Sequence, residues 1–209
     1  MKYLILRLRG PMQSWGLRGC FDIRHTETMP TKSGVIGILA AALGVARSDR
    51  KAVQELASLP MMAVCVKEGT IFTDYHTAGA GHGEGVPTLD GGSKGAVTKR
   101  QYLCGYEFLS VLSGPDVIID RCAVAVRHPV YALYLGRKSC IPSMPVFLDV
   151  CQDRAQLRTR LTEAGWKEEC RVVCEVEQDG QIERDVPVDF DTREFCSRRV
   201  SGDATDWLS

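Results

Sequence analysis

The chain has 209 residues, 44% hydrophobic and 25% charged, which suits one large domain or a domain with a smaller second lobe. Its 26 basic and 26 acidic residues give zero net charge, which argues against a strongly basic, stand-alone nucleic-acid binder but allows a local basic groove. Apolar runs stay well short of the ~20 residues of a membrane span, and the N-terminal run does not have a signal-peptide pattern. We therefore expect a cytoplasmic protein that does not contact a membrane.

The nine cysteines do not form the pattern of a disulfide framework. Their number is odd, they are scattered from Cys20 to Cys196, and no C-x-x-C pair occurs. Cys170 and Cys174 fall in an alternating, strand-like segment. We expect buried thiols that act as small hydrophobic side chains, with no metal site and no cofactor.

The N-terminal elements are marked by clear local signals. Residues 2–9 (KYLILRLR) predict a strand, and a loop follows to Pro30. An Ala- and Leu-rich stretch predicts a helix over 32–47 with Thr31 as N-cap. The next segment predicts a second helix, capped by Ser48.

The middle of the chain contains a glycine-rich excursion. Residues 61–69 predict a strand, and the pattern dissolves near 74–77. Residues 78–95 contain seven glycines and have no apolar period. Because the flanks look like two extended arms, we expect a long hairpin-like protrusion with a mobile tip, the alternative being a disordered surface loop.

The rest of the chain returns to regular patterns. Residues 101–114 predict one strand, residues 116–128 a helix, and a Gly- and Pro-broken segment leads to a short strand near Asp149. A helix over 155–164 and a hairpin that turns at Asp179–Gly180 follow.

This order of elements predicts an α+β fold. It fits a ferredoxin-like (RRM-like) βαββαβ sheet over 1–149, with the hairpin-like protrusion inserted at about 75–101 and a small C-terminal α/β lobe over 150–209. Such sheets commonly bind RNA, although the fold alone does not define a function.

The stretch RLRGPMQSWG places Trp15 in a Gly- and Pro-punctuated loop, beside Gln13 and close to several arginines. A flat ring beside cations suits stacking on a base, and it could equally close off the end of the first strand. We favour a packing role for Trp15, with Gln13 making the polar contact.

Three further segments carry candidate anion-binding groups. In PTKSG, free amides at a helix N-terminus join Lys32, so a phosphate site and a plain helix cap are both possible. The turn YLGRKSC combines adjacent Arg137 and Lys138 with a tyrosine, and TKRQY lies at the base of the protrusion. The alternative is that such basic turns are solvent-exposed and bind no ligand.

Catalytic patterns are weak. The chain has no G-x-S-x-G and no Walker loop, and its four histidines are dispersed. His25 and His76 lie beside the expected groove, where they could act as general acid and base in RNA cleavage or as hydrogen-bond donors to RNA. We favour the second role.

Six segments together resemble one family. YLILRLRGPMQSWG, PTKSGVIGILAAALG, DYHT, KRQYLCGYEF, YLGRKSC and REFCSRRV are similar, in this order and spacing, to the CasD-type (Cas-five) subunit of the type I-E CRISPR Cascade complex. The resemblance runs from the first strand to about Val200 and is weakest over 78–95 and after Asp149.

The resemblance implies a non-catalytic subunit that binds the 5′ handle of the crRNA, with a ferredoxin-like palm and the protrusion as its long β-hairpin thumb. It also implies a CasC-type backbone subunit and a CasA-type large subunit as partners, with target DNA held by the assembled complex. A type I-C relative cuts repeat RNA with a Tyr/Lys/His set that includes adjacent Lys and His, a dipeptide absent here, so an endoribonuclease is the alternative function. The candidate RNA-binding residues are Gln13, Trp15, Arg24, Thr31, Lys32, Ser33, Gly34, His76, Lys99, Arg100, Tyr102, Tyr134, Leu135, Gly136, Arg137, Lys138 and Ser139.

Overall fold

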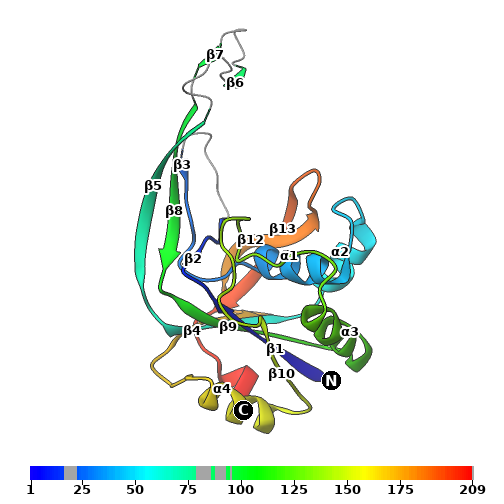
Figure 1. The fold of residues 1–209 in the computed structure, drawn as a ribbon. Coiled ribbons are helices and arrows are strands. Elements are labelled where there is room, and N and C mark those ends of the chain that lie inside the picture. Colours follow the sequence, from blue (N-terminus) through cyan, green and yellow to red (C-terminus); the bar gives the residue numbers. More distant parts are fainter. Residues whose placement is uncertain (17–22, 79–85, 88–92, 95, 209) are drawn as a thin grey trace.

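A computed structural model describes residues 1–16, 23–78, 86–87, 93–94 and 96–208. The fold is mixed α+β, and its body is built on a seven-stranded antiparallel sheet with the order β10-β1-β9-β4-β11-β13-β12 (Figure 1). In chain order the strands of this sheet are β1 (Lys2–Arg9), β4 (Met61–Lys67), β9 (Glu107–Gly114), β10 (Phe147–Cys151), β11 (Arg171–Val176), β12 (Gln181–Asp189) and β13 (Glu194–Ser201).

Five helices lie within the described residues, and most of them cover the sheet. They are α1 (Lys32–Leu43), α2 (Arg50–Ala57), α3 (Asp116–Arg127), α4 (Arg154–Glu163) and α5 (Thr205–Leu208). Among the described residues no helix has the length and apolar character needed to cross a membrane.

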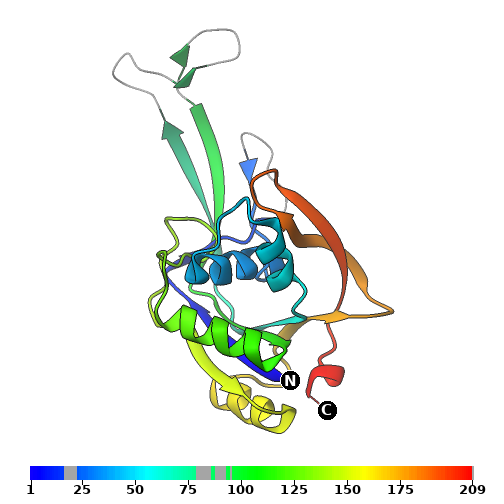
Figure 2. The same ribbon diagram turned by 90° about the vertical axis from the view of Figure 1, so that its right-hand side faces the viewer.

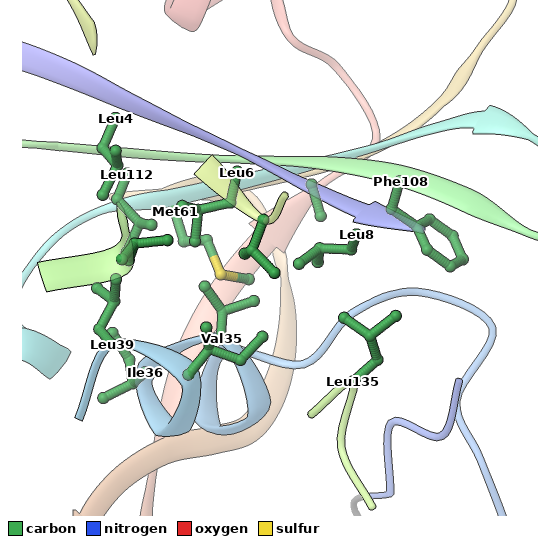
Figure 3. Close-up of a cluster of buried hydrophobic side chains, with 14 of the residues drawn as sticks. Leu4, Leu6, Leu8, Val35, Ile36, Leu39, Met61, Phe108, Leu112 and Leu135 are labelled. Carbon is green, nitrogen blue, oxygen red and sulfur yellow. The ribbon is translucent and has the colours of Figure 1, made fainter. Parts of the chain in front are cut away.

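The strand β1 lies inside the sheet and is buried on both faces. Its residues Leu4, Leu6 and Leu8 pack in one cluster with α1 and α3, as Figure 3 shows for α1. The alternate residues Tyr3 and Ile5 pack in a second cluster with α4 and α5. Burial on both faces explains why β1 has a continuous apolar run rather than an alternating one.

The caps fix the helix boundaries. The predicted N-cap Thr31 is confirmed, because its side chain accepts a hydrogen bond from the amide of Gly34 at 3.2 Å. Helix α1 ends at Leu43, four residues earlier than predicted, since Gly44 has the left-handed backbone (φ 73°) that ends helices. The cap of α2 is Asp49 and not Ser48, and the Asp49 carboxylate accepts from the amide of Ala52 at 3.1 Å.

A long strand arm projects from the body (Figures 1 and 2). Strands β5 (Thr70–Ala78) and β8 (Ala96–Cys104) pair along their whole length, so the strand pattern does not dissolve near 74–77 as predicted. Two short strands, β3 (Ile23–Arg24) and β2 (Met12–Gln13), pair with the other edge of β8. We call β5, β8 and β3 the arm.

The far end of the arm holds two further short strands, β6 (Val86–Pro87) and β7 (Ser93–Lys94), which pair with each other. The prediction of a mobile tip concerns mainly residues 79–85, 88–92 and 95, which lie outside the described residues. The single strand predicted over 101–114 is wrong: Gly105, with φ 74°, separates β8 in the arm from β9 in the body.

The predicted helices over 116–128 and 155–164 are confirmed as α3 and α4, and the short strand near Asp149 is β10. The predicted hairpin at Asp179–Gly180 is wrong, because β13 lies between β11 and β12 and pairs with both. The actual hairpin is β12–β13. These strands continue the sheet of β1, β9 and β4, while a domain boundary near 149 stays a prediction.

Candidate nucleic-acid interface

The YLGRKSC segment forms a loop that packs against the loop after β1. The carbonyl of Leu135 accepts a hydrogen bond from the amide of Ser14 at 3.0 Å. Gly136 has φ 91°, and a Cβ built there would lie 1.7 Å from the carbonyl oxygen of Ser14. Only glycine fits this approach, so the loop is held at one position beside the start of the arm.

Arg137 joins this loop to the foot of the arm. Its Nη1 donates to the carbonyl of Gln101 at 3.1 Å, and its Nη2 donates to the carbonyl of Arg24 at 3.0 Å. The guanidinium carbon also lies 4.8 Å from the centre of the Tyr102 ring. The donors of Arg137 are therefore largely occupied inside the chain, and this side chain positions the loop relative to β3 and β8.

Neighbours of Arg137 differ in their access to solvent. Lys138 and Ser139 are exposed, whereas Leu135 is buried and Tyr134 is half-buried. Tyr102 is also buried, beneath the guanidinium of Arg137. Within YLGRKSC, Lys138 is therefore the cation that remains available to a phosphate.

More basic side chains gather on the arm just above this loop. The register of the parallel pair β3–β8 places Arg24 opposite Arg100 and Ile23 opposite Lys99. Arg24 and Lys99 are exposed, and Arg100 is half-buried with its Nε 3.1 Å from the Thr98 hydroxyl. The structure thus brings together Arg24, Arg100, Arg137 and Lys138 from three segments, and we call this group the basic foot. Lys99 alternates with Arg100 along β8 and therefore lies on the opposite face of the strand pair.

Gln13 and Trp15 lie inside the protein. The Gln13 amide nitrogen donates to the carbonyls of Leu8 at 3.0 Å and Tyr106 at 2.9 Å, and its oxygen accepts from the Trp15 indole at 3.3 Å. Trp15 is 1% exposed and packs against Gly34 in α1. The polar contact that we expected Gln13 to offer to RNA is made within the chain, and Trp15 fixes the loop after β1.

The PTKSG segment is buried as well. Lys32 is 1% exposed, and its ammonium lies 2.7 Å from a carboxylate oxygen of Glu175. Burial lowers the pKa of Lys32, and the opposite charge of Glu175 counteracts this in part. The expectation of a free cation at this position is corrected, because the neighbouring strands enclose the side chain.

The chain supplies its own anion to the N-terminus of α1. The buried carboxylate of Asp185, in β12, accepts from the amide of Lys32 at 2.6 Å. Arg198, in β13, donates to the same carboxylate from Nε at 2.6 Å and from Nη2 at 2.9 Å. The helix N-terminus that was expected to meet a phosphate instead meets a carboxylate of the same chain, 153 residues away. Thr31 and Ser33 lie at the same closed end.

Within the described residues, His25 and His76 each contact another side chain. His25 Nδ1 lies 3.0 Å from the side-chain oxygen of Gln101, while His76 Nδ1 lies 3.7 Å from Asp74. The eight cysteines that fall in the described ranges are free thiols. Those ranges also contain no cluster of three or more side chains suited to a metal ion.

Two features of the site were missed by sequence reasoning. One is the pair of exposed aromatic residues on β5, Phe72 at 51% and Tyr75 at 65% exposure. Their signal was partial, since aromatic residues are typical of strands but do not show which side chains face the solvent. The other is the contact of Lys32 with Asp185 and Glu175, for which no local signal exists.

The fold and the basic foot define a class: an α+β protein with a strand arm, basic where the arm meets the body. The chain belongs to the Cas5 family of CRISPR-associated proteins, because the family model described as "CRISPR-associated protein (Cas_Cas5)" matches residues 3–201. The resemblance to CasD-type subunits is thereby confirmed at the level of the family.

Individual relatives agree with this assignment. The chain is 38% identical over 162 residues to the "CRISPR system Cascade subunit CasD" of Escherichia coli (strain K12), an alignment that covers 72% of this chain and 71% of that protein. A chain in a structure described as "CRISPR RNA-guided surveillance complex" has a TM-score of 0.79 and 31% identity, with 95% of this chain and 88% of that chain covered. A second structure, described as "Crystal structure of Cas protein", has a TM-score of 0.73 and 33% identity, with 95% and 92% covered.

Proposed function

We propose that this protein is a non-catalytic, crRNA-binding subunit of a type I-E Cascade complex. In this role it grips the 5′ handle of the crRNA, caps the backbone of CasC-type subunits and abuts the CasA-type subunit. The assembled complex then holds target DNA. Family membership and the similarity to a Cascade subunit support the assembly.

The basic foot is the observation that supports the RNA contact. Arg24 and Lys138 are exposed and come from β3 and the loop after α3, where Arg137 joins the two by its hydrogen bond to the carbonyl of Arg24. Because the whole chain has zero net charge, such a gathering is a local feature and not a consequence of composition. Exposed cations at one place suit a turning phosphate backbone.

We also interpret the body as a ferredoxin-like palm and the arm as its thumb. The partial strand order β10-β1-β9-β4 supports this interpretation, as do the helices α1 and α2 between β1 and β4 and the helix α3 between β9 and β10. In this arrangement the thumb is inserted between the second and third palm strands.

The test is to purify the complex through a tag on this chain and to sequence the small RNA that accompanies it. We expect one discrete size with a common 5′ end. Combined Arg24→Ala and Lys138→Ala should reduce the retained RNA and flatten its salt dependence, by a slope of about 0.7 for each single-strand phosphate that is no longer neutralised. Lys167→Ala is the matched control, because this exposed lysine lies after α4. Unchanged RNA retention and salt slope in the double variant would contradict the proposal.

The alternative is an endoribonuclease that processes the repeat RNA. Incubation of the purified chain with labelled repeat RNA, with and without divalent metal, separates the two functions. We expect no specific cut. Specific cleavage that disappears in His25→Ala or His76→Ala would establish the enzyme and contradict the binding-only role.

A further inference from the structure

The segment that joins α3 to β10 combines apolar and basic side chains without an acidic one. Residues 121–148 contain Arg121, Arg127, Arg137 and Lys138 but no aspartate or glutamate, although the whole chain has 26 acidic residues. In the view of Figure 2, the loop of this segment lies on the opposite side of the body from β12 and β13. Arg137 and Lys138 belong to the basic foot, and the rest of the loop has no part in the proposed RNA contact.

A hollow of about 450 Å³ lies between the C-terminal end of α3 and the loop that follows it. Arg127 is the only charged side chain among the described residues that line it. Exposed apolar side chains continue this surface beside the hollow, namely Val130 at 63%, Tyr131 at 58% and Ile141 at 63% exposure. We call the hollow and these three residues the α3 groove. The apolar residues that line the hollow include Val126, Pro129, Leu133, Pro142, Met144 and Phe147.

Backbone hydrogen bonds hold the α3 groove in place. The amide of Val130 donates to the carbonyl of Ala42, in α1, at 3.0 Å. Farther along the loop, the amide of Ser143 donates to the carbonyl of Arg9, in β1, at 2.9 Å. Three prolines in the segment restrict further backbone angles. Because the loop is fixed to α1 and β1, a partner that binds here does not have to order it first.

Arg127 supplies a positive charge at the wall of the groove. Its guanidinium carbon lies 3.8 Å from the centre of the Phe147 ring, which holds the side chain at this position. Arg127 is exposed and forms no hydrogen bond or ion pair with any described residue of the chain. A second cation, Arg9, has its Nη1 3.5 Å from the Met144 sulfur and 3.6 Å from the carboxylate of Glu107. A carboxylate from another molecule would therefore find its partner at Arg127.

This combination of groups suits a protein better than RNA. Exposed apolar patches mark interaction sites, and the centres of protein interfaces are apolar and enriched in Met and Arg. RNA bases stack on aromatic rings, whereas aliphatic and proline side chains form most of this groove and Arg127 covers the Phe147 ring. The absence of acidic residues over 121–148 disfavours a basic partner.

We propose that the α3 groove binds an acidic and apolar segment of another protein. An apolar side chain of that segment fills the hollow beside Met144, and a neighbouring carboxylate pairs with Arg127. This inference goes beyond the proposed function, because it uses none of the contacts to RNA. It assigns a second interaction surface to the chain, together with the chemistry of the segment that occupies it.

Photo-crosslinking identifies the occupant. The chain is purified in its complex with p-benzoylphenylalanine in place of Ile141, at the rim of the groove, and is irradiated. Ile182, an exposed residue of β12, is the control position. From position 141 we expect a crosslink to a protein segment with Asp or Glu beside an apolar residue, and from position 182 we expect no crosslink to that segment. Crosslinks from position 141 to RNA, to a second copy of this chain, to a segment without acidic residues or to no molecule would overturn the proposal.

Affinity measurements with a synthetic, fluorescein-labelled copy of the crosslinked peptide give a second test. Met144→Asp places a charge in the hollow and should weaken binding to the purified chain by about 5- to 30-fold, as expected for one well-buried interface side chain. Ile182→Asp is the matched control and should bind normally, and binding of Met144→Asp at the affinity of the wild type would overturn the proposal. Urea unfolding checks that each variant is folded.

A double-mutant cycle tests the ion pair and remains decisive if Met144→Asp does not fold. Arg127→Ala changes an exposed side chain, and the peptide is made a second time with its carboxylate replaced by the amide. If the two groups pair, the amide peptide should bind Arg127→Ala nearly as well as the original peptide does. Fully additive losses would show that the carboxylate does not meet Arg127 and would contradict the proposal.

The outcomes separate this inference from the proposed function. If RNA accompanies the wild-type complex while position 141 reaches no acidic and apolar segment, the proposal for the α3 groove is wrong and the RNA-binding role stands. If position 141 reaches such a segment but no RNA accompanies the complex, the groove is supported and the proposed function fails.

Discussion

Replacement of Asp185 by Asn should destabilise the protein strongly. The Asp185 carboxylate is fully buried and accepts hydrogen bonds from Arg198 Nε at 2.6 Å and Nη2 at 2.9 Å, as well as from the Lys32 amide at 2.6 Å. Asn keeps the shape and removes the charge, so the buried guanidinium loses the anion that compensates it. Removing one partner of a buried ion pair typically costs about 3–5 kcal/mol.

The surroundings of Arg198 decide which end of this range applies. Its Nη1 lies 3.6 Å from Glu175 and its Nη2 lies 3.5 Å from Glu183, so part of the charge compensation remains. We therefore expect a loss of about 3 kcal/mol in the free energy of unfolding. For a chain of this size the Tm should fall by about 6–12 °C.

The measurement is urea unfolding of the purified chain, followed by tryptophan fluorescence. Glu177→Gln removes an exposed carboxylate from the neighbouring β11–β12 connection, and it should change stability by less than about 0.5 kcal/mol. Lys32→Ala should also destabilise the chain, because the enclosed ammonium neutralises Glu175. A loss of less than about 1 kcal/mol in the free energy of unfolding of Asp185→Asn would contradict a stabilising role for the contact of Asp185 with Arg198 and the Lys32 amide.

Three further outcomes are expected. Gly136→Ala combines a positive φ with a clash against a carbonyl and should cost about 3 kcal/mol in thermal unfolding, whereas Gly105→Ala, with a positive φ but open space, should cost only about 1 kcal/mol. Arg137→Lys cannot span two carbonyls, so hydrogen exchange of the β8 amides should accelerate; unchanged exchange would contradict the positioning role. Burial raises the pKa of Cys174 to about 12, so at pH 8 iodoacetamide should label the exposed Cys196 and spare Cys174, which mass spectrometry of the folded chain can check.

The parts of the fold that local chemistry specifies could be predicted from the sequence. The apolar run of β1, the Thr31 cap of α1 and the Gly-Pro step before α3 each carry their own signal, and the structure has these elements in place. The pairing of β13 between β11 and β12 could not be predicted, because a turn at Asp179–Gly180 is compatible with a hairpin as well as with a crossover. The choice between them is made by distant strands.

In the candidate site, too, some features follow from local sequence and others depend on residues far away in the chain. Lys99 and Lys138 could be predicted from the sequence as candidate RNA contacts, because basic residues in turns and near strand ends are usually exposed. Both side chains are exposed in the structure. Lys32 has the same local appearance as an exposed helix-end lysine, yet Glu175, 143 residues away, holds it inside. Which face of the arm a residue occupies also depends on the register of β5 with β8, and composition carries no information about that register.

The strands β12 and β13 cover the N-terminus of α1, and they are synthesised much later than the helix. Lys32 is synthesised 153 residues before Asp185, and at about 5–20 residues per second the ribosome needs roughly 8–30 s to bridge that interval. Throughout this period helix α1 can form, but the amide of Lys32 at its N-terminus has no Asp185 carboxylate to bind. A nascent chain that stalls before β12 therefore leaves the N-terminus of α1 and the apolar side chains beside it uncovered. A protease or chaperone that recognises this uncovered surface would distinguish unfinished copies from complete ones.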